Sequence, residues 1–202
     1  MGFGKLRVLN DSVIQPGRGF PEHGHADFEI VTVQLQGQLS HTDSLGTRTI
    51  QAHDVQLITA GTGVSHSDLN TGAEEARQLQ IWVEPRRRGL PPASALRTFR
   101  PDQQPGRWLV VVAPAVTAEA PEALLMQQDA WFSLGHFPAG QPVPYVLHGA
   151  VPGVYLFVLE GRVEINGLVL ERRDAVAISF AEAFVLLPLT TCELLAIEVP
   201  LR

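Results

Sequence analysis

The stretch His23-Gly-His25 is followed further along the chain by Gly61-Thr-Gly-Val-Ser-His66-Ser-Asp68-Leu-Asn70, and these two segments decide how the sequence is interpreted. On an extended strand, residues two apart point to the same face, so both rings of the first segment share one side. Neutral imidazole is a common metal ligand. Three imidazoles with one carboxylate suit Fe, Cu, Ni, Mn or Zn rather than Ca or Mg. If the two segments meet in space, they form a metal site.

The composition is that of a globular protein. The chain has 202 residues, of which 45% are hydrophobic and 18% charged, enough for one large domain or two small ones. The net charge of −6 argues against a nucleic-acid surface, and Arg86-Arg87-Arg88 is interpreted as a solvated connector. The single Cys192 excludes an internal disulfide and fits a reducing compartment. Without an apolar leader or an apolar run of membrane-spanning length, we expect a cytoplasmic protein with no membrane contact.

Short runs rich in β-branched and apolar residues, punctuated by glycine and proline, predict an all-β fold. The clearest predicted strands are 28–35, 78–83, 108–112 and 154–159. One short helix is expected at 118–126. The segment 84–107 carries five prolines and six arginines and is interpreted as a crossover between two halves.

An internal repeat supports two halves of similar design. Leu35-Gln-Gly37-Gln-Leu39 resembles Leu159-Glu-Gly161-Arg-Val163. Each is followed by a turn and then by an Asp-led apolar strand, which begins at Asp54 in the first half and at Asp174 in the second. The recurrence of these units in the same order indicates a duplicated β-unit.

The histidine segments resemble the two-part signature of the cupins, which are jelly-roll barrels. The first part runs from Gly17 through His23, His25 and Glu29 to Gly37, and its last glycine spacing and a missing proline depart from the pattern. Because His23, His25 and Glu29 have the same parity, they are expected to face the barrel interior from one strand.

Six motifs in order narrow the resemblance to the pirin family, and they cover residues 1–85 densely. They are Phe20-Pro-Glu-His-Gly-His, Phe28-Glu-Ile-Val-Thr, His41-Thr-Asp-Ser-Leu-Gly, Asp54-Val-Gln, Ala60-Gly-Thr-Gly-Val-Ser-His-Ser and Leu79-Gln-Ile-Trp-Val-Glu-Pro. The resemblance implies a bicupin with two jelly-roll barrels, an N-terminal metal-binding barrel over residues 1–100 and a C-terminal barrel over residues 101–202 without a metal site.

The resemblance implies metal ligands at His23, His25, His66 and Asp68, with iron the expected metal and Cu, Ni, Mn or Zn as alternatives. Two positions depart from the family. Asp68 stands where the family has glutamate, so the ligand sits farther from the metal, a water bridges the gap, or Glu29 supplies the carboxylate. His53 stands where the family usually has glycine.

Aligning the two copies on Gly37 and Gly161 tests whether the second barrel could bind metal. The positions that match His23, His25, Glu29 and His66 are Leu147, Gly149, Gly153 and Leu186. None of these is a ligand. The second half is therefore expected to serve packing.

Other residues have simpler interpretations. We expect His41, His136 and His148 at the surface or at a pocket rim, and His53 in a turn. Gly61 and Gly63 are expected to give the backbone the close turn that aims His66. The tryptophans at 82, 108 and 131 are predicted to be core residues, and Cys192 a small buried hydrophobe.

Three functions follow from the resemblance. The first is a dioxygenase of the quercetin 2,3-dioxygenase type, which takes a small aromatic, flavonol-like substrate and O2, with Asp68 or Glu29 as the general base. The second is a non-catalytic regulator in which the oxidation state of iron controls binding to a protein partner. The third is a cupin whose metal site has decayed. The acidic net charge favours protein over DNA as a macromolecular partner.

Overall fold

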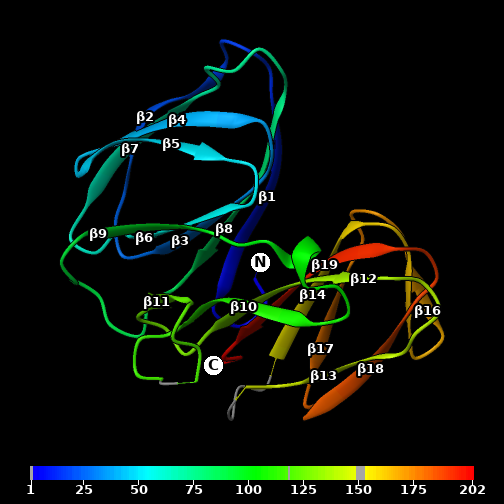
Figure 1. Ribbon diagram of the computed structural model, residues 1–202. Helices are drawn as coiled ribbons and strands as arrows, with labels where there is room; N and C mark the ends of the chain where they lie inside the picture. The colour runs from blue at the N-terminus through cyan, green and yellow to red at the C-terminus, as the bar shows by residue number, and fades with distance from the viewer. Residues whose placement is uncertain (1, 118, 149–152) are drawn as a thin grey trace. The chain divides into compact units, whose positions relative to one another are not determined.

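The computed structural model describes residues 2–117, 119–148 and 153–202, and it is built almost entirely of antiparallel strands (Figure 1). The chain divides into two compact units. The first consists mainly of Leu6–Phe99 with Met126–Gln128, and the second of Arg100–Leu125 and Asp129–Arg202 with Phe3–Lys5.

Two antiparallel sheets make up the first unit. One sheet has the order β1-β8-β3-β6-β9 and the other β2-β7-β4-β5 (Figure 1). The bounds are β1 Leu6–Ile14, β2 Gly19–His25, β3 Glu29–Gln36, β4 Gln38–Asp43, β5 Gly46–Gln51, β6 Asp54–Thr59, β7 Val64–Leu69, β8 Ala76–Val83 and β9 Ala93–Thr98. β3 and β6 are rich in Val, Ile and Thr and lie in the middle of their sheet, as β-branched residues favour.

The second unit repeats this plan with the sheets β11-β10-β12-β19-β14-β17 and β13-β18-β15-β16. Its bounds are the 3-10 turn η1 Pro101–Gln103, β10 Trp108–Pro114, β11 Leu124–Met126, β12 Trp131–Phe137, β13 Val143–Val146, β14 Gly153–Glu160, β15 Val163–Ile165, β16 Leu168–Leu170, β17 Ala175–Ser179, β18 Ala183–Pro188 and β19 Cys192–Val199.

The strand order confirms the repeat and the fold class. β7 lies between β2 and β4 in the first unit, and β18 lies between β13 and β15 in the second. β3 lies between β8 and β6, as β14 lies between β19 and β17. Gly37 and Gly161, which end the equivalent strands β3 and β14, both have positive φ angles, at 69° and 86°. The protein therefore contains two cupin barrels of the same topology.

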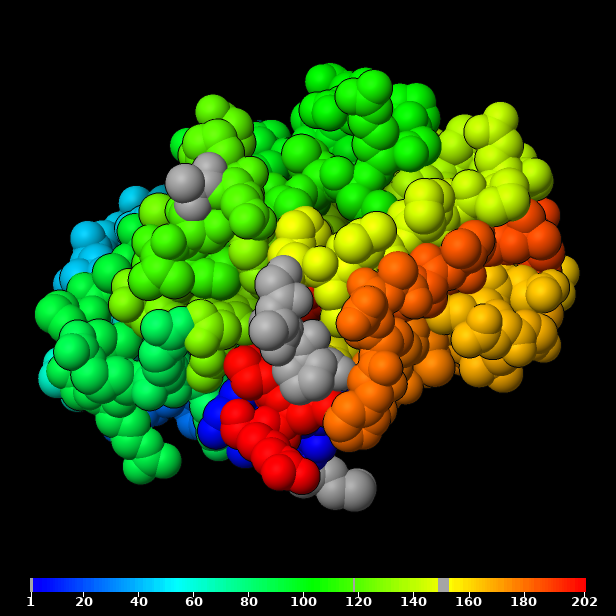
Figure 2. Space-filling view, turned by 90° about the horizontal axis from the view of Figure 1, so that it is seen from below, coloured from blue at the N-terminus to red at the C-terminus, as the bar shows by residue number. Residues whose placement is uncertain are grey.

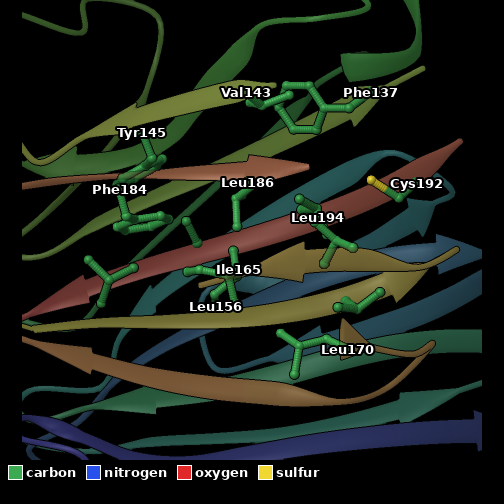
Figure 3. Packing of buried hydrophobic residues seen from close by; sticks show 14 residues of the cluster. Phe137, Val143, Tyr145, Leu156, Ile165, Leu170, Phe184, Leu186, Cys192 and Leu194 are labelled. Carbon is green, nitrogen blue, oxygen red and sulfur yellow. The ribbon is translucent and has the colours of Figure 1, made fainter. Parts of the chain in front are cut away.

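The interior of the second unit is packed with apolar side chains (Figure 3). Tyr145 of β13 stacks on Phe184 of β18 with 5.1 Å between ring centroids, and Leu186 beside them is fully buried. Cys192 is buried in the same cluster, where burial and then the Glu193 charge raise the pKa of its thiol to about 11. Cys192 is thus the small buried hydrophobe expected from the sequence.

Of the expectations for the connecting segments, one was wrong and one holds only in part. No α-helix lies at 119–126; this stretch is turn followed by β11, while residue 118 falls outside the described residues. Pro121 disfavours helical φ and ψ at the residue before it. In so short a segment, helix nucleation is also unfavourable, and there is not enough packing to offset its free energy. The segment 84–107 is only partly a crossover, because β9 pairs with β6 inside the first unit.

Several large apolar side chains are exposed in both units. In the second unit the most exposed is Phe180, which follows β17 in the segment drawn in orange in Figure 2. No helix among the described residues is long and apolar enough to cross a membrane.

His53 lies in the turn before β6, as expected, with a φ angle of 75°. A side chain with a Cβ costs about 1–2 kcal/mol in this left-handed region, while glycine gives back about 0.5–1 kcal/mol through its larger unfolded-state entropy. His53→Gly is therefore expected to raise the free energy of unfolding by about 0.5 kcal/mol, or the melting temperature by roughly 1–2 °C. His53→Ala keeps the strain and should show no such rise. A lower melting temperature for His53→Gly would show that the side chain itself stabilises the turn.

Candidate metal centre

Three histidines meet where β2 pairs with β7. His23 lies directly opposite His66 in the antiparallel register, and His25 lies two residues along β2. The ring centroids are 4.4 Å apart for His23–His66, 4.8 Å for His23–His25 and 5.0 Å for His25–His66. One nitrogen from each ring lies within 4.8 Å of the others. The two histidine segments of the sequence thus come together as expected.

The turn before β7 fixes the direction of His66. Gly61 and Gly63 have positive φ angles of 50° and 144°, and a Cβ on Gly61 would overlap the carbonyl oxygen of Leu90. From this turn, every second residue of β7 is buried, so that Val64, His66 and Asp68 all point inward.

The hydrogen bonding around these rings leaves nitrogen lone pairs free to bind a metal ion. Nδ1 of His23 lies 2.8 Å from the carbonyl oxygen of Pro21; since that oxygen can only accept, Nδ1 carries the proton and Nε2 keeps its lone pair. Among the described residues, Nε2 of His25 and both ring nitrogens of His66 are buried without a hydrogen-bond partner. Such groups are costly unless something binds them.

Electrostatics keep two of these rings neutral. Burial lowers the pKa of His25, and the neighbouring His23 lowers it further. Burial also lowers the pKa of His66 to about 4, with a partly opposing effect from Asp68. Neutral, unpartnered imidazoles are the form that coordinates a transition metal. The three-histidine cluster therefore fits a metal ion.

Asp68 belongs to a second, overlapping cluster with His41 and His66. Its Oδ1 lies 2.7 Å from Nδ1 of His41, while its Oδ2 lies 3.6 Å from Nδ1 of His66. On the far side of the His41 ring, Nε2 lies 3.1 Å from Oδ2 of Asp43. All these side chains are at least nine-tenths buried. Asp68 is thus connected to the metal cluster through His66 and held from behind by His41.

The surroundings of His41 favour its positively charged form. Ionised carboxylates only accept hydrogen bonds, so both ring nitrogens must donate when Asp68 and Asp43 are ionised. Burial lowers the pKa of His41, but the hydrogen bonds and charges of Asp68 and then Asp43 outweigh it, and the net pKa lies above its ordinary value. The expectation that His41 lies at the surface or at a pocket rim was wrong.

Glu29 lies in neither cluster. Its carboxylate accepts hydrogen bonds from the backbone N–H groups of Gln127 and Gln128 and from the hydroxyl of Thr59. Burial raises the pKa of Glu29, and these hydrogen bonds partly offset the shift. The expectation that it shares one strand with the two histidines was wrong, because β2 ends at His25 and Asp27, with a φ angle of 54°, breaks the extended backbone before β3.

The second unit has apolar residues at the equivalent positions. Leu186 on β18 is paired with Val143, and Phe184 with Tyr145, so these pairs match His66–His23 and Val64–His25. The alignment of the two copies places Leu147 at the position of His23, but Leu147 lies beyond the end of β13. The alignment assumes equal loop lengths, whereas more residues separate β13 from β14 than separate β2 from β3. Gly149 lies outside the described residues.

A cavity of about 410 Å³ opens beside the cluster. It is lined by His23 and Phe20 from β2 and, on the opposite sheet, by residues of β1 and β8 that include Trp82. Trp82 also meets the ring of His25 edge-on, with 4.7 Å between centroids. Trp82 is therefore half-buried at a cavity rather than the simple core residue that the sequence suggested.

Two cupin barrels, one of which carries a three-histidine cluster beside a cavity, define the class of bicupin proteins with a candidate metal centre. The family model described as Pirin matches residues 1–83, and the model described as the quercetinase C-terminal cupin domain matches residues 111–199. The chain belongs to the pirin family.

Relatives along almost the whole chain agree with this assignment. A pirin-like protein of Caulobacter vibrioides is 36% identical over 98% of this chain and 84% of its own length. A quercetin 2,3-dioxygenase of Escherichia coli is 33% identical over 99% of this chain and 84% of its own. The crystal structure of the bacterial pirin YhhW from Escherichia coli in complex with nickel(II) matches with a TM-score of 0.90 and 31% identity, over 99% of this chain and 84% of that one.

Proposed function

We propose that this chain is a metal-dependent dioxygenase of the quercetin 2,3-dioxygenase type, acting on a flavonol-like aromatic substrate with O2. The observation that carries the proposal is the cluster of His23, His25 and His66 beside a cavity, in which Nε2 of His25 and both ring nitrogens of His66 are buried without a hydrogen-bond partner among the described residues. The name of the Escherichia coli relative supports the reaction type. The nickel(II) complex of YhhW supports a divalent first-row metal, which we propose to be iron, with Cu, Ni, Mn or Zn as alternatives.

Each residue of the site has a separate task. His23, His25 and His66 hold the ion, which when bound supplies a Lewis acid for a hydroxyl oxygen of the substrate. Asp68 acts as the general base and takes the hydroxyl proton on Oδ2, because Oδ1 is already occupied by His41. The positive charge of His41 stabilises the carboxylate and fixes its orientation. Glu29, whose carboxylate accepts hydrogen bonds from three donors, anchors residues 127–128 to the first unit.

Metal analysis and oxygen consumption test the proposal. Protein purified without added metal should contain one transition-metal ion per chain and should consume O2 together with quercetin. With ¹⁸O2, a dioxygenase places both labelled atoms in its products. Bound metal without turnover would contradict the enzyme and favour the alternative, a regulator that binds a protein partner according to the oxidation state of its metal. Absence of metal would contradict both.

Asp68→Glu is expected to raise turnover several-fold. The longer side chain carries its carboxylate one methylene further towards the proton it removes, and catalysis depends steeply on that distance. Asp68→Asn, which keeps the shape but cannot take a proton, should lower turnover by about 100-fold. Initial rates of quercetin loss measure both. Unchanged or lower turnover in Asp68→Glu would count against Asp68 as the general base.

A further inference from the structure

The sheet that faces the histidines has an unusual inner surface of buried, uncharged amides. Gln78 and Gln80 on β8 have the same parity as Trp82, which lines the cavity, so all three point to its side. On β3, Gln34 pairs with Gln78 in the register, and Thr32 pairs with Gln80. Gln78 is 1% exposed and Gln80 is 9% exposed. Amides buried this deeply normally find partners.

One of the glutamines that line the cavity has an amide nitrogen without such a partner. Nε2 of Gln78 has no hydrogen-bond partner among the described residues, although it is buried. The neighbouring Gln80 differs, since its Oε1 accepts a hydrogen bond from Nε1 of Trp82 at 3.0 Å. An indole N–H can only donate, so this bond turns the amide oxygen of Gln80 towards Trp82. The unpaired donor of Gln78 is costly in the free protein and becomes favourable once an acceptor enters the cavity.

The chemistry of the lining selects the ligand. Among the described residues that line the cavity there is one carboxyl group, Asp11, and no lysine or arginine. A phosphate or carboxylate ligand would find no lysine or arginine side chain to pair with here. Phe20 and Trp82 supply apolar ring faces, and a volume of about 410 Å³ is within the usual range for a small-molecule site. The lining thus suits an uncharged ring compound that carries hydroxyl or carbonyl oxygens.

We propose that Gln78 is a specificity-determining residue, whose Nε2 donates a hydrogen bond to a hydroxyl or carbonyl oxygen of an uncharged ring ligand held beside His23. This inference deepens the proposed function and rests on it for the position of the reacting group. In this role Gln78 lies away from the metal and hydrogen-bonds the part of the ligand that does not react. A site built to hydrogen-bond a ligand oxygen rejects ligands that lack it.

Gln78→Leu tests the proposal by two readouts that move in opposite directions. The variant removes an unpaired buried amide and keeps a similar volume, so it should raise the melting temperature by a few degrees. It should also weaken the binding of quercetin by about tenfold, as expected for the loss of one buried hydrogen bond. Binding is measured by calorimetry on the metal-loaded protein without O2, so that no turnover occurs. An amide that served only the fold would lower the melting temperature when replaced.

Gln56→Leu is the matched control. Nε2 of Gln56 on β6 is likewise buried without a partner among the described residues, but Gln56 does not line the cavity. It should gain stability as Gln78→Leu does and keep wild-type affinity for quercetin. Equal affinity of wild type and Gln78→Leu would overturn the inference, as would preferential binding of the anion 4-hydroxybenzoate over quercetin, or failure of wild type to bind quercetin. The first two outcomes are separate from failure of the proposed function, which metal content and O2 uptake decide, whereas failure of wild type to bind quercetin would contradict both.

Discussion

Replacing His66 with alanine is expected to lower the affinity for the metal by about 100-fold or more and to abolish turnover. Within the described part of the chain, His66 is the one residue shared by both candidate metal clusters, and both of its ring nitrogens are buried without partners. Loss of a single residue in the shell that only supports a ligand already costs 10–100-fold in metal affinity, and loss of a ligand costs more. His23 and His25 cannot compensate, since two imidazoles leave the ion without the third nitrogen.

Metal content per chain and thermal melting with and without added metal measure this effect. A ligand at about 100 times its dissociation constant stabilises a protein by about 2.7 kcal/mol, so wild type should gain several degrees on addition of metal and His66→Ala almost none. His136→Ala is the matched control, because His136 lies in the second unit and pairs with Glu193. A full complement of metal in His66→Ala would contradict the assignment of the site.

The histidine cluster could be predicted from the sequence because its geometry is local to two strands. Residues two apart on one strand share a face whatever surrounds them. The glycines at 61 and 63 indicate the turn that aims His66. The family resemblance added that the two strands are neighbours. What the sequence supplied here is periodicity and turn chemistry, which depend little on the rest of the fold.

Other parts of the site depended on tertiary pairing and could not be predicted in this way. Parity failed for Glu29 because one left-handed residue, Asp27, interrupts the strand. The role of His41 depends on its neighbour across the sheet, Asp68, which only the register reveals. A signal was nevertheless present: Leu39, His41 and Asp43 alternate along β4, and a histidine in phase with a buried leucine is expected to be buried.

The second unit shows the same limit. Its apolar interior could be inferred, since none of the aligned positions is a metal ligand, but the particular residues could not. The alignment on Gly37 and Gly161 assumes equal loop lengths, whereas the strand pairing places Val143 rather than Leu147 opposite Leu186. A change in loop length has little effect on stability, so the sequence pattern gives little indication of it.

His41→Leu is expected to destabilise the protein by about 3 kcal/mol, which lowers the melting temperature of a chain of this size by roughly 6–12 °C. The variant fills the buried position with an apolar side chain but removes the positive charge between Asp68 and Asp43, which are 5% and 8% exposed. Two buried carboxylates then lack their partner. Asp43 still accepts the backbone N–H of Leu45 at 2.7 Å, whereas Asp68 loses the bond that fixes its orientation.

A compensated variant separates lost charge pairing from lost packing. His41→Leu combined with Asp43→Asn and Asp68→Asn carries the same leucine but no buried carboxylate, and it should regain at least half of the lost stability, because neutral amides are far cheaper to bury than unpaired charges. Melting of the metal-free proteins at pH 7 makes the comparison. If the single and triple variants melt at the same temperature, the cost comes from the leucine itself, and His41 is not the positive charge that holds Asp68 behind the metal centre.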